Sequence, residues 1–128
     1  MRTITIDLEV IANNYKTLKE LTGGQVLAIV KADAFGHGMI EVSKKLESIS
    51  VDILGTADID EAMELRHAGI KSPIMAWLHG KNTQFEDAIS NDIELGASAL
   101  ATLEKIGTSA KKVGKVRSEE HTSELQSQ

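Results

Sequence analysis

One lysine stands where the chain changes from apolar to polar. Lys31 follows five consecutive apolar residues, 26–30, and precedes Gly36 and Gly38. A strand of that composition is expected to be buried on both faces. Its carboxyl end lies where parallel α/β barrel enzymes place their catalytic residues. Partial desolvation there favours the neutral amine, which attacks an aldehyde to form a Schiff base. From position alone, a lysine that extends into solvent or pairs with Asp33 is the favoured interpretation.

The other groups that could do chemistry lack partners at suitable spacings. His67 and His79 are not related by the i, i+4 spacing of a helical metal site. His37 lies between two glycines, and we expect it to fix the loop by a hydrogen bond. The carboxylates of Asp60 and Glu61 are explained by helix capping and the helix dipole. The chain has no cysteine, so thiolate sites and disulfides are excluded, and we predict no metal site.

The periodicity of apolar residues indicates the elements that must position Lys31. The expected strands are 3–6, 25–31, 53–57, 73–78, 93–95 and a last one over 112–116. The expected helices run from a cap at Asp7 to Gly23, then over 39–48, 58–69, 85–89 and 100–106. Asp58, with Glu61 three residues later, resembles a capping box. Strands that alternate regularly with helices are typical of right-handed parallel βα units.

Two α/β architectures fit this alternation, and the glycine pattern separates them. Residues 31–38 lack the G-x-G-x-x-G spacing of a doubly wound dinucleotide fold, which favours a closed (β/α)8 barrel of the TIM type. Such a barrel takes about 250 residues, and this chain has 128. We therefore predict the N-terminal half of a barrel. Open strand edges and uncovered apolar faces would make the isolated chain poorly soluble or prone to association.

Composition excludes several classes of function. The formal net charge is -5, and one tryptophan, one tyrosine and two phenylalanines are the only aromatic side chains. Nucleic-acid binding is therefore not expected. No apolar run approaches the roughly 18 residues that cross a bilayer, and the first residues do not resemble a signal peptide. We expect no membrane association and a cytoplasmic location.

The last segment, residues 117–128, differs in composition from everything before it. Ser, Glu and Gln predominate, and no apolar periodicity remains. The run RSEEHTSELQS is similar to the in-frame translation of a sequencing-adaptor oligonucleotide. We expect a barrel domain over 1–116 and a non-native, disordered segment over 117–128, with a natural disordered tail as the alternative.

The residues around Lys31 also resemble a known motif. The run VKADAFGHG, residues 30–38, is similar to the pyridoxal-phosphate lysine motif of alanine racemases, which commonly reads V-K-A-[ND]-A-Y-G-H-G. Residues 6–14, 57–66 and 69–74 follow the pattern of the same family in the same order. The resemblance covers residues 3–116 and implies the N-terminal barrel segment of an alanine racemase.

The resemblance implies a role for several residues. Lys31 would hold pyridoxal 5'-phosphate as an internal aldimine and serve as one of two acid/base groups on opposite faces of the substrate. Phe35 would lie near the cofactor, where most members carry a tyrosine, and it keeps the ring without the hydroxyl. Ile29 and Trp77 would line the cofactor pocket, although a place in the barrel core explains them equally well.

The resemblance also implies what the whole protein does. A homodimeric parent would interconvert L-alanine and D-alanine, a small-molecule amino-acid substrate, and supply D-alanine for peptidoglycan. The second base, a tyrosine of a C-terminal β-domain, and the phosphate-binding loops belong to parts of the family that this chain lacks. We therefore expect the 128 residues alone to be inactive. Two alternatives are a non-catalytic barrel protein that binds pyridoxal phosphate for cofactor homeostasis and a racemase of another amino acid.

Overall fold

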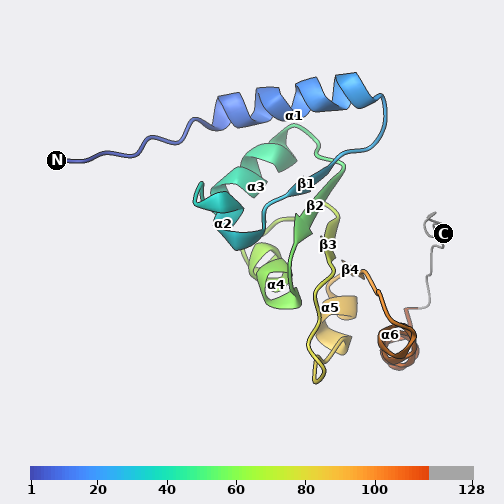
Figure 1. The fold of residues 1–128 in the computed structure, drawn as a ribbon. Helices are drawn as coiled ribbons and strands as arrows, with labels where there is room; N and C mark the ends of the chain where they lie inside the picture. The colour runs from blue at the N-terminus through green and yellow to red at the C-terminus, as the bar shows by residue number, and fades with distance from the viewer. Residues whose placement is uncertain (116–128) are drawn as a thin grey trace.

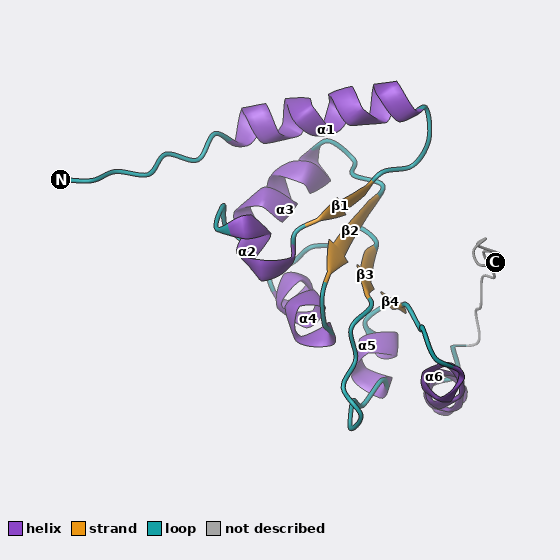
Figure 2. Ribbon diagram, viewed as in Figure 1, coloured by secondary structure: helices purple, strands orange, loops and turns teal. Residues whose placement is uncertain are grey.

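Four parallel strands form one sheet, and they lie in the order in which they occur along the chain (Figure 1). The computed structural model describes residues 1–115. The strands are β1 (Leu27–Ile29), β2 (Ile53–Thr56), β3 (Ile74–Ala76) and β4 (Ile93–Leu95). The helices are α1 (Leu8–Thr22), α2 (Lys31–Phe35), α3 (Met39–Ser48), α4 (Ile59–His67), α5 (Glu86–Ser90) and α6 (Leu100–Val113). Figure 2 shows the alternation of strand and helix.

The strand order distinguishes the two architectures that the sequence allowed. A doubly wound sheet reverses direction at a switch point, whereas a barrel adds each new strand beside the previous one. Here each strand pairs in parallel with the next, from β1 to β4. The chain is therefore the N-terminal half of a (β/α)8 barrel, as predicted.

The core lies on the face of the sheet that the helices cover. Leu54, Ile74 and Ile93 are in register on neighbouring strands and are 0%, 0% and 5% exposed. Other buried side chains come from the helices: Tyr15, Met39, Val42, Leu46 and Leu65. This covered face corresponds to the outside of a closed barrel, where helices surround the strands.

The opposite face of the sheet is the inner face of the half barrel, and it is exposed at the two edge strands. The register places Ile29, Gly55, Met75 and Glu94 in one row on this inner face. Ile29 is 56% exposed. The prediction that β1 is buried on both faces is therefore wrong for residues 1–115. Its apolar run is typical of a strand in a closed barrel, and β1 here is an edge of a four-stranded sheet.

Two expected strands are absent from the described residues. Residues 3–6 form no strand, and they lie ahead of α1 without a place in the sheet order. Lys112 and Val113 belong to α6, which ends at Gly114 in the left-handed conformation. The predicted range of 100–106 for this helix is therefore too short, because α6 continues to Val113. Helices α1, α3, α4 and α5 lie close to their predicted ranges, whereas α2 was not predicted. No helix within residues 1–115 is long and apolar enough to cross a membrane.

Capping side chains set two of the helix starts, as expected. Asp7 accepts hydrogen bonds from the backbone N–H groups of Glu9 and Val10 at 3.1 and 3.2 Å, which caps α1. Asp58 accepts one from the N–H of Glu61 at 2.9 Å and caps α4. Carboxylates in these positions satisfy helix donors that have no partner inside the helix.

A guanidinium joins three segments at the amino end of the strands. Arg66, in the last turn of α4, donates from Nη1 to the carbonyl oxygens of Ile70 and Ser72 at 2.9 and 2.8 Å. Its Nε and Nη2 donate to the carbonyls of Asn91 and Asp92 at 2.8 and 3.1 Å. Arg66 therefore ties the end of α4 to the segments that lead into β3 and β4.

A carboxylate plays a similar role beside β1. Asp52 accepts hydrogen bonds from the Lys19 ammonium at 2.7 Å, the Val26 N–H at 2.9 Å and the Tyr15 hydroxyl at 3.0 Å. The hydrogen bond from Lys19 is the largest cause that lowers the pKa of Asp52, followed by that from the Val26 N–H. These contacts attach α1 and the start of β1 to β2.

The Asp52 cluster predicts a loss of stability in acid. Because the folded-state pKa of Asp52 lies below its ordinary value, the stabilisation is complete above about pH 4 and is lost as the pH falls through the folded-state pKa. Asp52→Asn should flatten the acid limb of a plot of urea midpoint against pH. Part of the slope should persist, since Lys115 likewise lowers the pKa of Asp92. Glu20→Gln, on the exposed side of α1, is the control, and equal acid slopes in both variants would contradict the assignment.

Candidate functional site

Lys31 lies directly beyond β1, at the carboxyl edge of the sheet. The N–H of Val30 donates to the carbonyl of Gly55 at 2.8 Å, which extends the pairing of β1 with β2 by one hydrogen bond. Val30 is 1% exposed and belongs to the core on the covered face. Lys31, the next residue, is solvent-exposed. It occupies the strand end where barrel enzymes place catalytic side chains.

The backbone after Lys31 forms a left-handed turn, which the sequence analysis did not predict. Four consecutive residues without glycine, 32–35, have φ between 52° and 57°. Each such residue costs roughly 1–2 kcal/mol, so a run of them persists only where the surroundings hold it. The only local signal is Asp33, because aspartate tolerates this conformation better than most residues.

Hydrogen bonds within the loop hold this turn. The carbonyl of Asp33 accepts from the N–H groups of Gly36 and Gly38 at 3.0 and 2.9 Å. The Asp33 carboxylate accepts from the N–H of Met39 at 2.8 Å and so starts α3. His37 Nδ1 lies 2.9 Å from the carbonyl of Ala34, which confirms the predicted loop-fixing role of His37. The Asp33 carboxylate is thus engaged with the backbone, not with the Lys31 ammonium.

Glu61 connects the turn to the neighbouring strand. One carboxylate oxygen accepts from the N–H of Ala32 at 2.8 Å, and the other accepts from the N–H of Ala57 at 2.8 Å. The predicted capping box would have the Glu61 carboxylate accept from the N–H of Asp58, but it accepts from Ala57, one residue earlier. The position of Glu61 in the first turn of α4 agrees with the predicted interaction with the helix dipole. Asp58 provides the cap, while the Glu61 carboxylate bridges the ends of β1 and β2. The capping-box spacing of Asp58 and Glu61 predicts a local contact and gives no indication of this bridge.

Of the other residues of the predicted site, Ile29 and Trp77 lie at the inner face, and Phe35 lies in the turn after Lys31. The Phe35 side chain ends the left-handed turn and is 91% exposed. Trp77 follows β3 and lies over Gly55, where an added Cβ would come within 2.9 Å of the indole Cζ3. On the other side of Trp77, a Cβ at Gly96 would lie 3.2 Å from the Trp77 Cβ. Two glycines therefore make room for Trp77, whereas Ile29 and Phe35 remain largely uncovered within residues 1–115.

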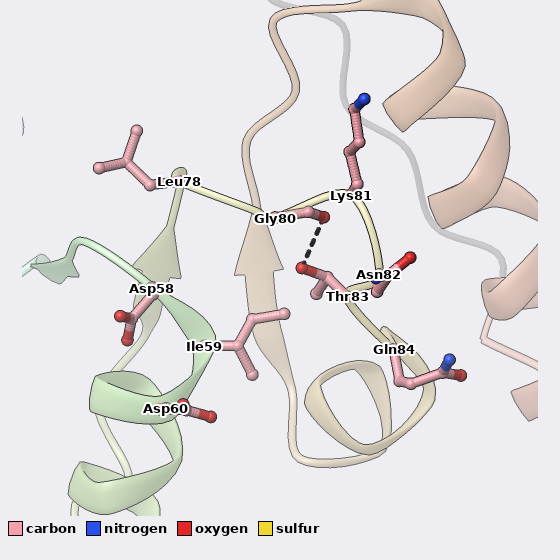
Figure 3. A pocket seen from close by; sticks show the side chains of 9 residues that line it. All are labelled: Asp58, Ile59, Asp60, Leu78, Gly80, Lys81, Asn82, Thr83 and Gln84. Atoms are coloured by element: carbon pink, nitrogen blue, oxygen red, sulfur yellow. Dashed lines mark hydrogen bonds between the residues drawn. The ribbon is translucent and has the colours of Figure 1, made fainter.

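A separate open pocket of about 630 Å³ lies between the start of α4 and the loop after β3 (Figure 3). It is lined by Asp58, Ile59, Asp60, Leu78, Gly80, Lys81, Asn82, Thr83 and Gln84. Thr83 donates to the carbonyl of Gly80 at 2.8 Å and closes the loop on itself. Lys31 and Phe35 do not line this pocket. Among the described residues, no three histidine or acidic side chains are grouped so that they could hold a metal ion.

Comparisons with known proteins point to one family. Residues 6–120 match the family described as alanine racemase, N-terminal domain. The alanine racemase of Mycolicibacterium smegmatis is 42% identical over 111 residues, which cover 86% of this chain and 28% of that relative. The alanine racemase of Mycobacterium tuberculosis H37Rv is 35% identical over 111 residues, 86% of this chain and 29% of its own length.

Solved structures show the same likeness in three dimensions. The alanine racemase of D-cycloserine-producing Streptomyces lavendulae superposes with a TM-score of 0.80 at 33% identity, covering 88% of this chain and 31% of that chain. The alanine racemase of Clostridium difficile 630 gives 0.74 at 40% identity, covering 84% and 28%. The chain thus spans less than a third of these relatives. The predicted boundary at 116 stays a prediction, since residues 117–128 lie outside the described part of the structure.

Proposed function

The chain belongs to the alanine racemase N-terminal domain family, and from that premise we propose that Lys31 binds pyridoxal 5'-phosphate in the full-length protein. The observation that carries the proposal is the position of Lys31 at the carboxyl end of β1, followed by a left-handed turn that its own loop and Glu61 hold in place. A strained backbone that the surroundings maintain is characteristic of functional sites.

The residues present fit one part of such a cofactor site. Lys31 offers a solvent-accessible amine, and the neighbouring inner face is apolar and open at Ile29. The exposed ring of Phe35 offers an apolar surface without the hydroxyl that a tyrosine would add. When bound, pyridoxal phosphate acts as an electron sink that acidifies the α-proton of an amino acid. The Lys31 amine would then accept or return that proton on one face of the substrate.

Racemisation needs a second acid/base group on the opposite face. We place that group, together with the phosphate-binding residues, in the part of the protein that lies beyond this chain. The full-length protein would interconvert L-alanine and D-alanine as a homodimer and supply D-alanine for peptidoglycan, while residues 1–128 alone would not catalyse the reaction. The names of the relatives favour alanine as substrate over another amino acid, and favour catalysis over cofactor storage.

A chimeric enzyme tests this proposal. Residues 6–115 of this chain would replace the matched segment of the Mycolicibacterium smegmatis alanine racemase, whose remaining sequence supplies the rest of the protein. We expect the chimera to convert L-alanine to D-alanine and the 128-residue chain to show no turnover with added cofactor. A folded chimera that binds the cofactor without racemising alanine would contradict the proposal. Turnover by the isolated chain would contradict its inactivity.

A further inference from the structure

Glu61 makes an unusual pair of contacts for a residue in the first turn of a helix. Its two carboxylate oxygens accept from two backbone N–H groups, Ala32 and Ala57, that belong to different strand ends and lie 25 residues apart in the chain. The side chain is partly buried. A carboxylate is acceptor-only and has two oxygens, so it suits two converging donors better than any other side chain of this size.

The bond to Ala32 acts on the residue next to Lys31. The N–H of Ala32 belongs to the peptide group that also contains the Lys31 carbonyl, so Glu61 fixes the plane of that peptide. Ala32 is the first of the left-handed residues, with φ 53° and ψ 48°. The bond to Ala57 anchors the same carboxylate to the residue directly after β2. The start of the turn is therefore held against the neighbouring strand as well as by its own loop.

We propose that Glu61 is a positioning residue for Lys31: its carboxylate bridges the ends of β1 and β2 and so fixes the backbone from which the lysine side chain extends. The inference rests on the proposed function of Lys31. Glu61 does not touch the reacting atoms in this role, and it acts through the Lys31–Ala32 peptide. Glutamine cannot replace it, because an amide has one acceptor oxygen and its NH2 group would face one of the two N–H donors.

The test uses two readouts, the first on the 128-residue chain and the second on the chimeric enzyme, whose remaining sequence supplies the phosphate-binding residues. The first is hydrogen exchange at the amides of Ala32 and Ala57, measured by NMR. The second is the share of pyridoxyl label on Lys31, relative to the other lysines, after incubation with pyridoxal phosphate and reduction with borohydride. The variant is Glu61→Gln, and the control is Glu64→Gln, which makes the same charge change at an exposed position of α4. Thermal unfolding of each variant reports whether the fold is kept.

We expect Glu61→Gln to accelerate exchange at Ala32 on the order of tenfold, as the loss of a charge-assisted hydrogen bond implies. The Lys31 share of the label should fall several-fold, while Glu64→Gln matches the unsubstituted chain in both readouts. An unchanged Lys31 share in folded Glu61→Gln overturns the inference and leaves the role of Lys31 intact. An unsubstituted chimera that labels Lys31 no more than its other lysines overturns the proposed role of Lys31 itself.

Glu61→Asp provides a second measurement if the glutamine variant does not fold. It keeps the charge in the first turn of α4, but the shorter side chain cannot span both amides. The inference requires the Lys31 share to fall in proportion to the loss of protection at Ala32. A Lys31 share that follows the Ala57 amide instead, or that follows neither amide, overturns it.

Discussion

Lys31→Arg should lower the rate of alanine racemisation by the chimeric enzyme by about 10³-fold or more, within the range expected for loss of an acid/base group. The guanidinium of arginine stays protonated at working pH, so it provides neither a nucleophilic amine for the cofactor aldehyde nor a proton acceptor for the substrate. The charge and much of the length of the side chain are retained. The measurement is kcat for conversion of L-alanine to D-alanine with saturating cofactor.

The matched control for this prediction is Lys44→Arg. Lys44 is an exposed residue of α3, outside the left-handed turn and the inner face. This variant should keep the kcat of the chimera, and its cofactor content should be unchanged. If Lys31→Arg retained a rate close to that of Lys44→Arg, Lys31 would have neither of its proposed roles.

Arg66→Met should lower the free energy of unfolding by about 3 kcal/mol. Several hydrogen bonds from a charged donor are lost, and water that reaches some of their acceptors offsets part of this loss. The methionine keeps the apolar stem, but the carbonyls of Ile70, Ser72, Asn91 and Asp92 lose their donor. The segments that lead into β3 and β4 would then be held by strand pairing, by apolar contacts and by the remaining polar contacts of Glu47 and Lys115. Urea unfolding, followed by the fluorescence of Trp77 at concentrations where the chain is monomeric, measures the change.

Two further variants define the cause of this loss. Arg66→Lys keeps the charge but lacks the planar fork, so it should recover only a minor part of the stability. Lys44→Met removes an exposed positive charge and should change the free energy of unfolding by no more than about 0.5 kcal/mol. If Arg66→Met also changed the free energy of unfolding by no more than about 0.5 kcal/mol, the four carbonyls would not depend on the guanidinium.

The sequence was informative where local chemistry determines the structure. Asp7 and Asp58 mark helix starts because a short carboxylate satisfies free N–H groups, and both caps are present. The range of α3 and that of β4 match the predictions residue for residue. The half-barrel fold followed from the alternation of elements, the absence of a dinucleotide glycine pattern and the chain length, since few architectures accept that order of elements.

Prediction failed where contacts distant in sequence decide the outcome. The exposure of β1 depends on strands that residues 1–115 do not contain, which no local pattern reveals. The left-handed turn after Lys31 uses alanine and phenylalanine, which ordinarily favour other conformations, and it is held partly by Glu61 from α4. The role of Glu61 was hidden for the same reason, because a capping-box spacing accounts for the residue without any tertiary partner.

Because of the left-handed turn, the motif around Lys31 must fit a particular backbone conformation as well as supply a reactive group. At residues 32–35 a β-branched side chain would be strongly disfavoured, because its Cβ substituents crowd the backbone when φ is positive. Small residues at 32 and 34 and aspartate at 33 are compatible with this backbone. The alanines and the aspartate therefore specify a path for the chain, and within residues 30–38 the lysine alone is proposed to form a covalent bond. Substitutions in this stretch are consequently limited by conformation even where the side chain performs no chemistry.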